Sequence, residues 1–322
     1  MDRTRALAVL VAGMTMTSIL APGAARAHGD EAPTPSFPGV LLDWRPEPPI
    51  LAGVLVAAVA WLWMSRRVAR RHPLHPPSRW RSAAFFGGLA AIVVALVSPI
   101  EAYEGSLFSV HMLQHLILEL VAAPLLILAA PITLALRAAS PAIRRQLLAL
   151  LHSRLVAVVS FPLLAWVVFA GVNWGWHFSS LYNQALENPG LHDVEHLSFL
   201  IAALLFWWPV VGVDPSRWRL PYAARLFYLF LAMPQNSFLG VALMSAPAVL
   251  YSHYRAVERT WGPTPLADQN VGGALMWVGG DLVFLLAMGL VVAAWVRHED
   301  RRTARLDARL DSEAAREVDP QG

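Results

Sequence analysis

The sequence contains no cysteine and no lysine. Without cysteine the chain forms no disulfide, iron–sulfur cluster or covalently attached c-type haem, and it offers no thiol nucleophile. Any metal ion must therefore be held by histidine, methionine or carboxylate side chains. All 25 basic residues are arginine, and against 22 acidic residues they leave a formal net charge of only +3. This small excess gives no indication of nucleic acid as a partner.

Charged residues are also scarce. They make up 15% of the 322 residues, whereas 57% are hydrophobic. An average soluble domain carries about 25% charged residues, so the composition indicates a membrane-embedded chain with polar ends. The sequence shows no catalytic triad, P-loop or nucleotide fingerprint, so we predict neither catalytic residues nor a nucleotide-cofactor site and do not expect an enzyme.

The first residues are typical of a signal peptide. Residues 1–27 combine Arg3 and Arg5, an apolar stretch and an A-x-A-like cleavage site at 25–27. An uncleaved first helix is the alternative, and both interpretations place residue 28 outside the membrane. After cleavage, the His28 imidazole and the free α-amine would chelate copper together, or residue 28 would simply begin a tail.

Seven apolar segments follow, each near the roughly 20 residues that cross a hydrocarbon core of about 30 Å. They are residues 49–65, 82–100, 108–136, 155–173, 192–212, 222–246 and 271–296. Pro124 and Pro131 predict a kink or early end in the third segment. The sequence thus predicts an all-α, multi-pass membrane protein. An outer N-terminal segment (28–48) precedes the seven-helix domain (49–296), and a charged tail (297–322) follows it.

Arginine placement predicts the orientation, because short cytoplasmic loops collect positive charge. The connections after the first, third and fifth segments, together with the tail, hold 19 arginines. The opposite side holds Arg45, Arg255 and Arg259. We therefore expect the N-terminus outside and the C-terminus in the cytoplasm, with the tail from Arg297 as a solvated extension of the last helix.

Two pairs of histidines lie at the outer ends of predicted helices. His111 and His115 are four residues apart in the third segment, and His192 and His196 are four apart in the fifth. Residues at this spacing share one helix face about 5–6 Å apart, which suits two imidazoles that bind one metal ion. Each pair taken alone is equally compatible with hydrogen-bonded interfacial histidines. Because both lie at the same depth, we predict a shared metal site.

Four acidic residues extend this pattern. Glu119 continues the helix face of His111 and His115, Glu195 flanks His196, and Asp281 lies inside the seventh segment. These carboxylates would orient imidazoles, carry protons, or remain protonated against neighbouring helices. Asp268 precedes the last segment, where an aspartate caps exposed helix amides.

Other residues on the outer side have more than one interpretation. His177 and His253, in predicted outer loops, would receive or release the ion. Gly272 and Gly273 permit close helix packing. The thioether of Met112, like those of the other outer methionines, would help to select Cu(I), although most membrane methionines simply pack.

Several of these motifs resemble one known family. HMLQH at 111–115, followed by APLL at 123–126 and Pro131, resembles the histidine-rich third span of the polytopic CtaG proteins, assembly factors for a haem–copper cytochrome c oxidase. The likeness covers about residues 45–296. It continues through HDVEH at 192–196, FWWP at 206–209, YSHY at 251–254, DQ at 268–269 before GG at 272–273, and MW at 276–277. Asn270 departs from the pattern, where a second glutamine is expected.

This resemblance implies a multi-pass protein of the bacterial inner membrane that helps to mature cytochrome c oxidase by assisting copper insertion. Its partners would be oxidase subunits, membrane lipid and a copper donor that the sequence does not identify. Two alternatives remain open. One is a b-type haem protein whose iron is held by one histidine from each pair. The other is a proton-coupled metal transporter that uses Glu119 and Asp281 as the route inward.

Overall fold

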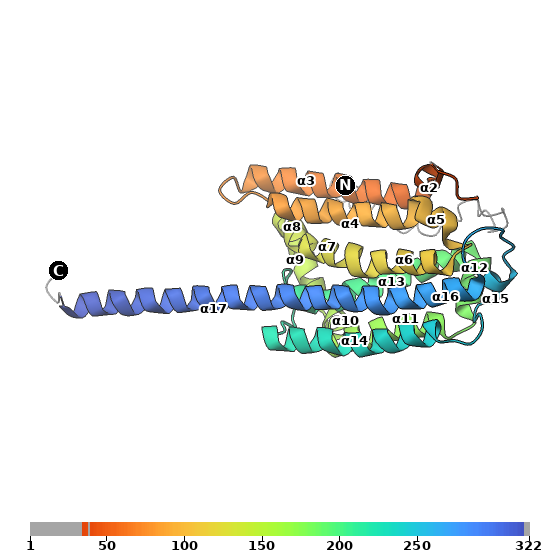
Figure 1. The fold of residues 1–322 in the computed structure, drawn as a ribbon. Helices are drawn as coiled ribbons and strands as arrows, with labels where there is room; N and C mark the ends of the chain where they lie inside the picture. Colours follow the sequence, from red (N-terminus) through yellow and green to blue (C-terminus); the bar gives the residue numbers. More distant parts are fainter. Residues whose placement is uncertain (1–33, 38, 319–322) are drawn as a thin grey trace.

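The computed structural model describes residues 34–37 and 39–318, and side chains as far as residue 310. The predicted signal peptide and His28 lie outside the described residues. Within these ranges the chain is helical and has no strand. The long helices run side by side along one direction, as Figure 1 shows.

Six helical stretches in the described part of the chain are long and apolar enough to cross a membrane. They are α3 (Pro48–Arg71), α4 with α5 (Arg79–Glu104), the composite helix Phe108–Ala138, α13 (Pro189–Val211), α14 (Tyr222–Met244) and Pro265–Leu310. These stretches confirm six of the seven predicted segments as helices. Leu282, Leu285 and Leu286 are more than half exposed on α17 (Gly280–Val318), as expected for side chains that face lipid.

The fourth predicted segment is divided. Its residues form α10 (Arg154–Val159) and α11 (Pro162–His177), because Pro162 has no amide hydrogen with which to continue the first helix. The 16 residues of α11 extend about 24 Å, less than a hydrocarbon core of about 30 Å. Leu163 and Val167 on α11 are exposed, which is compatible with lipid contact, but a crossing by this segment stays a prediction.

Proline shapes the third stretch as predicted. It consists of α6 (Phe108–Ile117), a π-helical turn (Leu118–Ala122), α7 (Ala123–Leu128) and α8 (Pro131–Ala138). The widened π turn directly precedes Pro124, which cannot donate a backbone hydrogen bond. Ala130 has a left-handed backbone with φ 59°, so the helix ends before Pro131. The predicted break is confirmed.

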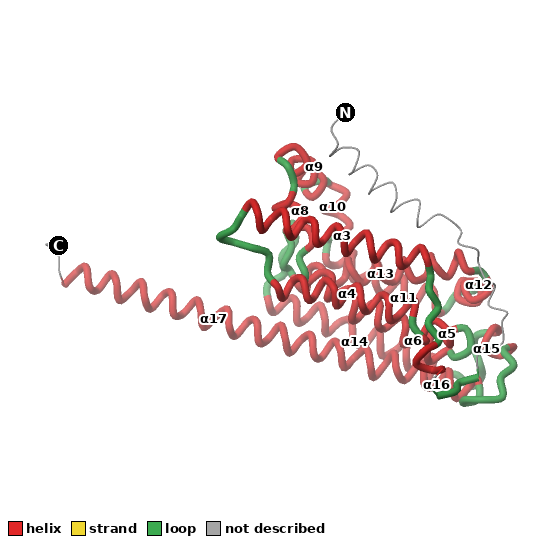
Figure 2. The backbone as a smooth tube through the Cα atoms, turned by 90° about the horizontal axis from the view of Figure 1, so that it is seen from above, coloured by secondary structure: helices red, strands yellow, loops and turns green. Residues whose placement is uncertain are grey.

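The last stretch extends well beyond the other helices. It is formed by α16 (Pro265–Ala274), a second π turn (Leu275–Gly279) and α17, which Figures 1 and 2 show projecting from one end of the bundle. Residues 297–310 are all exposed. The last helix therefore continues into the tail as predicted, and the position of this extension in the cytoplasm stays a prediction.

Short helices close the opposite end of the bundle. There, α12 (Leu181–Glu187) and α15 (Ser252–Ala256) lie beside the start of α6, and α2 (Gly39–Leu42) lies near α5 (Pro99–Glu104) (Figure 1). Phe108 stacks on Tyr251 with ring centroids 5.1 Å apart, and Tyr182 lies 4.2 Å from Tyr251. These buried aromatic rings cover the ends of the long helices opposite to the projecting α17.

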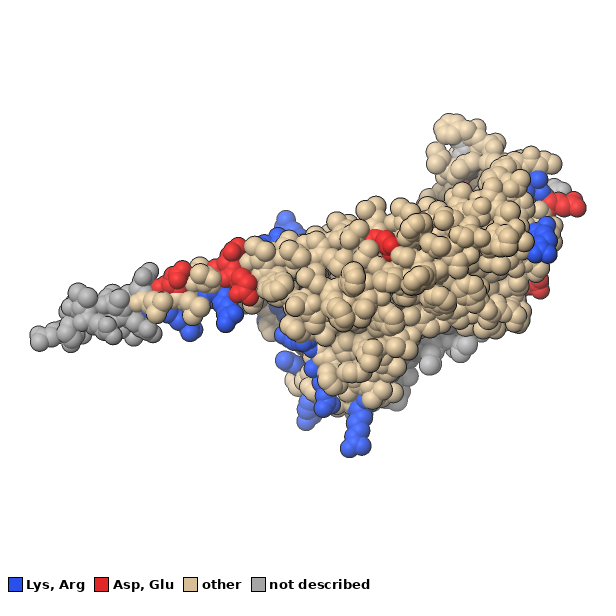
Figure 3. Space-filling view, turned by 60° about the horizontal axis from the view of Figure 1, so that its bottom comes forward, with Lys and Arg blue, Asp and Glu red and all other residues tan. Residues whose placement is uncertain are grey.

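The connections between helices gather the arginines at one end. The α3–α4 connection, α8 and α9 (Pro141–Leu151) lie at the end from which α17 projects (Figures 1 and 2). Figure 3 shows many blue side chains around the base of this extension and a smaller group at the far end. The fold is thus compatible with the predicted orientation.

Because the chain has no cysteine, single introduced cysteines can test the orientation without background labelling. Ser78 in the α3–α4 connection and Thr260 between α15 and α16 are both exposed. We expect a membrane-impermeant maleimide to label Thr260→Cys in intact spheroplasts and Ser78→Cys only after permeabilisation. The reverse pattern would contradict the orientation. Ser180→Cys, after α11, should behave like Thr260→Cys if the fourth segment crosses the membrane.

Candidate metal centre

Four histidines meet inside the bundle near the end that the arginine distribution predicts to be the outer one. His111 and His115 on α6 face His192 and His196 on α13, and all four are buried. The ring centroids of His111 and His192 lie 5.2 Å apart, and those of His115 and His196 lie 5.6 Å apart. The two i, i+4 pairs therefore share one interior space.

A buried carboxylate lies beside two of these imidazoles. The Nε2 atoms of His111 and His115 are 2.9 Å apart, and each lies 4.0 Å from one carboxylate oxygen of Glu195. Glu195 is 0% exposed, and neither carboxylate oxygen has a hydrogen-bond partner among the described residues. A carboxylate buried without a hydrogen bond is costly unless a cation lies near it.

The spacing of these three side chains suits one metal ion. Nitrogen and oxygen ligands bind first-row metals such as zinc at about 2.0–2.2 Å, so ligands on one ion lie roughly 3–4 Å apart. The potential ligand atoms of His111, His115 and Glu195 all lie within 4.8 Å of one another. His111, His192 and His196 form a second combination within the same limit.

Neighbouring groups fix the orientation of His111. Its Nδ1 lies 2.9 Å from the Tyr254 hydroxyl and 3.1 Å from a Glu104 carboxylate oxygen. The same hydroxyl donates to the Glu104 backbone oxygen at 3.0 Å. Because the hydroxyl proton is donated to the Glu104 backbone oxygen, the hydroxyl oxygen and the Glu104 carboxylate are both acceptors for a proton on His111 Nδ1. The lone pair of His111 Nε2 is then aimed at His115 and Glu195, as in metal sites where the remote imidazole nitrogen is hydrogen-bonded.

In the second pair, His196 contacts the side-chain amide of Gln114. His196 Nε2 lies 3.1 Å from Gln114 Oε1. The Gln114 amide donates to the Ala95 backbone oxygen at 2.9 Å and to a Glu101 carboxylate oxygen at 2.6 Å. The cluster is therefore continuous with α5, which carries Glu101 and Glu104.

Sequence reasoning missed Glu101, Glu104, Gln114 and Tyr254. Glu101 and Glu104 follow the predicted end of the second segment at residue 100, so they were not assigned to a helix. Pro99 followed by an acidic residue is a typical helix start, and it would have placed both carboxylates on α5. Gln114 and Tyr254 stand inside the HMLQH and YSHY motifs, but neither was assigned a role at the site.

His177 and His253 occupy helices rather than loops. His177 is the buried last residue of α11, and its Nε2 lies 3.3 Å from the Met112 sulfur. Its ring centroid is 6.3 Å from that of His115, so it borders the cluster. His253 in α15 donates from Nε2 to the Gly105 backbone oxygen at 2.8 Å and belongs to none of the three-residue combinations above.

Three predicted carboxylates are satisfied elsewhere. Glu119 accepts from the Asn173 amide at 2.9 Å. Asp281 accepts from Ser237 at 2.6 Å and from Asn236 at 3.3 Å. Asp268 accepts from the Phe108 amide at 2.7 Å and from the Ser109 hydroxyl at 2.5 Å, so it caps α6. These contacts favour a structural role for all three carboxylates. Asp268 caps α6, whereas the sequence predicted that it would cap the last helix.

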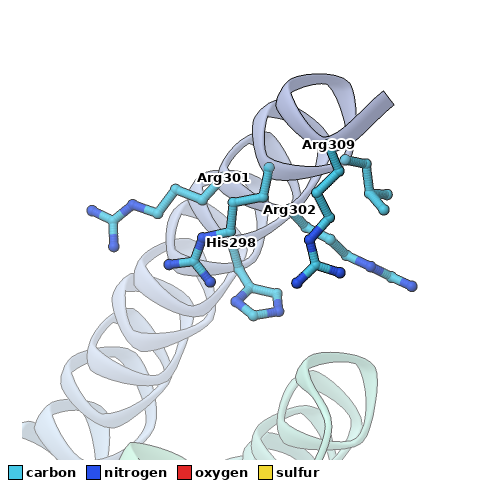
Figure 4. Close-up of a pocket in the computed structure, with 6 residues that line it drawn as sticks. His298, Arg301, Arg302 and Arg309 are labelled. Carbon is cyan, nitrogen blue, oxygen red and sulfur yellow. The ribbon is translucent and has the colours of Figure 1, made fainter. Parts of the chain in front are cut away.

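A second group of titratable side chains lies on the C-terminal extension. Figure 4 shows His298, Arg301, Arg302 and Arg309 on one stretch of α17, and Arg305 lines the same shallow pocket. Four guanidinium groups repel metal cations and provide no acceptor. Within the described residues, the histidine cluster between α6 and α13 is therefore the better candidate for a metal centre.

Comparison with known proteins identifies the family of the chain. The family model described as cytochrome c oxidase caa3 assembly factor matches residues 59–298, which include α6, α13 and every residue of the histidine cluster. The chain belongs to this family. The resemblance inferred from the sequence motifs is confirmed. Because the family is one of assembly factors, membership favours a non-catalytic role.

The curated relatives are mycobacterial. Uncharacterized proteins of Mycobacterium bovis and Mycobacterium tuberculosis are each 33% identical over 296 residues, which cover 89% of this chain and 44% of the relative. An uncharacterized protein from Mycobacterium leprae is 33% identical over 277 residues, which cover 84% of this chain and 42% of the relative. The chain thus spans less than half the length of the curated relatives it matches. No solved structure matches it.

Proposed function

We propose that this assembly factor binds a copper ion at the outer end of its membrane domain and delivers it to a haem–copper cytochrome c oxidase during assembly. The observation that supports this proposal best is the buried Glu195 carboxylate, which faces the Nε2 atoms of His111 and His115 at 4.0 Å. Copper is here the cargo, and the oxidase receives it.

The ligand types suit a transferable copper ion. Imidazole binds copper well, and the Irving–Williams order favours Cu(II) over the other divalent first-row metals. The Met112 sulfur beside His177 adds a soft donor that suits Cu(I). Because the chain has no thiolate, the ion would exchange more readily than from a cysteine site.

The geometry favours a copper ion held directly by side chains over the two alternatives, a b-type haem and a proton-coupled transport route. The imidazole rings contact one another, with His192 and His196 centroids 4.2 Å apart, and Phe199 lies 4.3 Å from His115. A porphyrin would need these rings to separate. A transport route through Glu119 and Asp281 finds little support, since both carboxylates accept hydrogen bonds from neighbouring helices.

The proposed setting is the bacterial inner membrane. We infer seven spans, with the α10–α11 segment as the fourth, because Leu155 and Val158 on α10 are as exposed as Leu163 and Val167 on α11. The arginine distribution supports a periplasmic position for the histidine cluster. There it would meet copper outside the cytoplasm.

Oxidase activity at limiting copper tests the proposal. In cells that depend on this chain, we expect His196→Ala to lower cytochrome c oxidase activity severalfold while the protein still inserts, and excess copper to restore it. His152→Ala is the control, because His152 is exposed at the opposite end of the bundle. Full activity of His196→Ala at limiting copper, or equal loss in the control, would contradict copper delivery by the cluster.

A further inference from the structure

A second potential metal position adjoins the histidine cluster. Glu101 and Glu104 lie three residues apart on α5 and turn their carboxylates toward His192. The ligand atoms of these three side chains lie within 4.8 Å of one another, and His192 Nε2 is 3.8 Å from a Glu104 oxygen. None of the sequence motifs pointed to this combination of two carboxylates and one imidazole.

The two positions differ in exposure. Glu101 is partly exposed, whereas Glu104 and Glu195 are 0% exposed. Of the three carboxylates, Glu101 is thus the one with exposed surface. We call the position of Glu101, Glu104 and His192 the outer position, and that of His111, His115 and Glu195 the inner position.

Shared side chains connect the positions. One Glu104 oxygen lies 3.8 Å from His192 in the outer position and 3.1 Å from Nδ1 of His111, whose Nε2 faces the inner position. Gln114 joins Glu101 to His196 on a parallel path. Side chains that contact both positions thus link the outer position to the inner one.

The surroundings of the outer position favour cations. The Tyr103 hydroxyl donates to Asp43 at 3.1 Å, so a third acidic residue lies beside Glu101 and Glu104 on α5. Glu47 and Arg45 both interact electrostatically with Glu101, and Glu104 adds to the negative charge. Acidic groups that outnumber the one arginine among them raise the local concentration of metal cations and the rate at which these bind.

We propose that Glu101, Glu104 and His192 form an outer position that captures a divalent first-row metal ion and passes it to the inner position. This inference rests on the proposed function, since it concerns how the same cluster is loaded. Carboxylate-rich coordination suits rapid capture of a hydrated cation, whereas the imidazole-rich inner position holds copper more tightly.

The test uses full-length protein in detergent, stripped with a chelator and titrated with Cu(II) alone. Electron paramagnetic resonance counts the bound ions, and stopped-flow tryptophan quenching measures the loading rate. For Glu101→Gln we expect two ions per chain to become one, loading to slow by about tenfold or more, and affinity at the remaining position to be unchanged. Glu101→Asp should restore most of the rate.

Glu258→Gln is the matched control, because it removes one exposed carboxylate from the same end of the protein. If Glu101→Gln keeps the stoichiometry and loading rate of the unmodified chain, the outer position is refuted while the proposed function stands. If the unmodified chain binds no copper, the proposed function itself fails. Equal slowing by Glu258→Gln would reduce the effect to general charge attraction and also refute the outer position.

Discussion

Replacing Glu195 by glutamine is expected to abolish tight copper binding while leaving the metal-free protein as stable as before or more stable. The carboxylate is a proposed ligand, so its loss should weaken binding by more than the roughly 10–100-fold that follows loss of a group that merely orients a ligand. In the metal-free state the change removes a buried carboxylate that has no hydrogen-bond partner among the residues that the structure describes. Neutralising such a group relieves an unfavourable burial.

The opposite signs of the two effects make this prediction sharp. Copper affinity is measured by competition with a chromophoric chelator, and stability by thermal unfolding in detergent with and without copper. Asp193→Asn on the same helix is the control, because Asp193 is exposed and should change neither quantity. Loss of stability in metal-free Glu195→Gln would indicate a structural role for this carboxylate and contradict its assignment as a ligand.

Replacing Gly273 by alanine is expected to disrupt the packing of α14 against α16. A Cβ atom at residue 273 would lie 2.5 Å from the Met244 nitrogen and 2.7 Å from the Gly240 oxygen. These are backbone atoms, so no side chain can rotate away. Overpacking of this kind costs typically about 1–3 kcal/mol, and occasionally more. We expect a clearly lower unfolding temperature and a lower yield of inserted protein.

Gly289→Ala in α17 is the matched control. A Cβ at residue 289 meets nothing within 4 Å, and alanine is favoured over glycine in helices by about 1 kcal/mol. This variant should therefore be neutral or slightly stabilising. Equal stability of the two variants would show that α14 and α16 need not approach as closely as described. The sequence predicted close helix packing at Gly272 and Gly273. The short distances from a Cβ at residue 273 to α14, and from a Cβ at residue 272 to the Phe108 ring, confirm that prediction.

Local patterns predicted much of the fold. Apolar segments of suitable length located six helical stretches, and Pro124 and Pro131 located the break in the third of these segments. The fourth segment was predicted as one helix because its hydropathy is continuous. Hydropathy does not report that Pro162 lacks an amide hydrogen. The absence of this hydrogen ends α10 before α11 begins.

The sequence by itself determined that the chain is helical and apolar, that thiolate chemistry is absent, and that two histidine pairs lie on single helix faces. Periodicity along one helix is enough for each of these conclusions. Only the tertiary structure decided which carboxylates join the histidines: Glu195, Glu104 and Glu101 do, whereas Glu119, Asp268 and Asp281 bond elsewhere. The reason is that periodicity defines a face but not the rotation of that face toward neighbouring helices, which packing between distant segments sets.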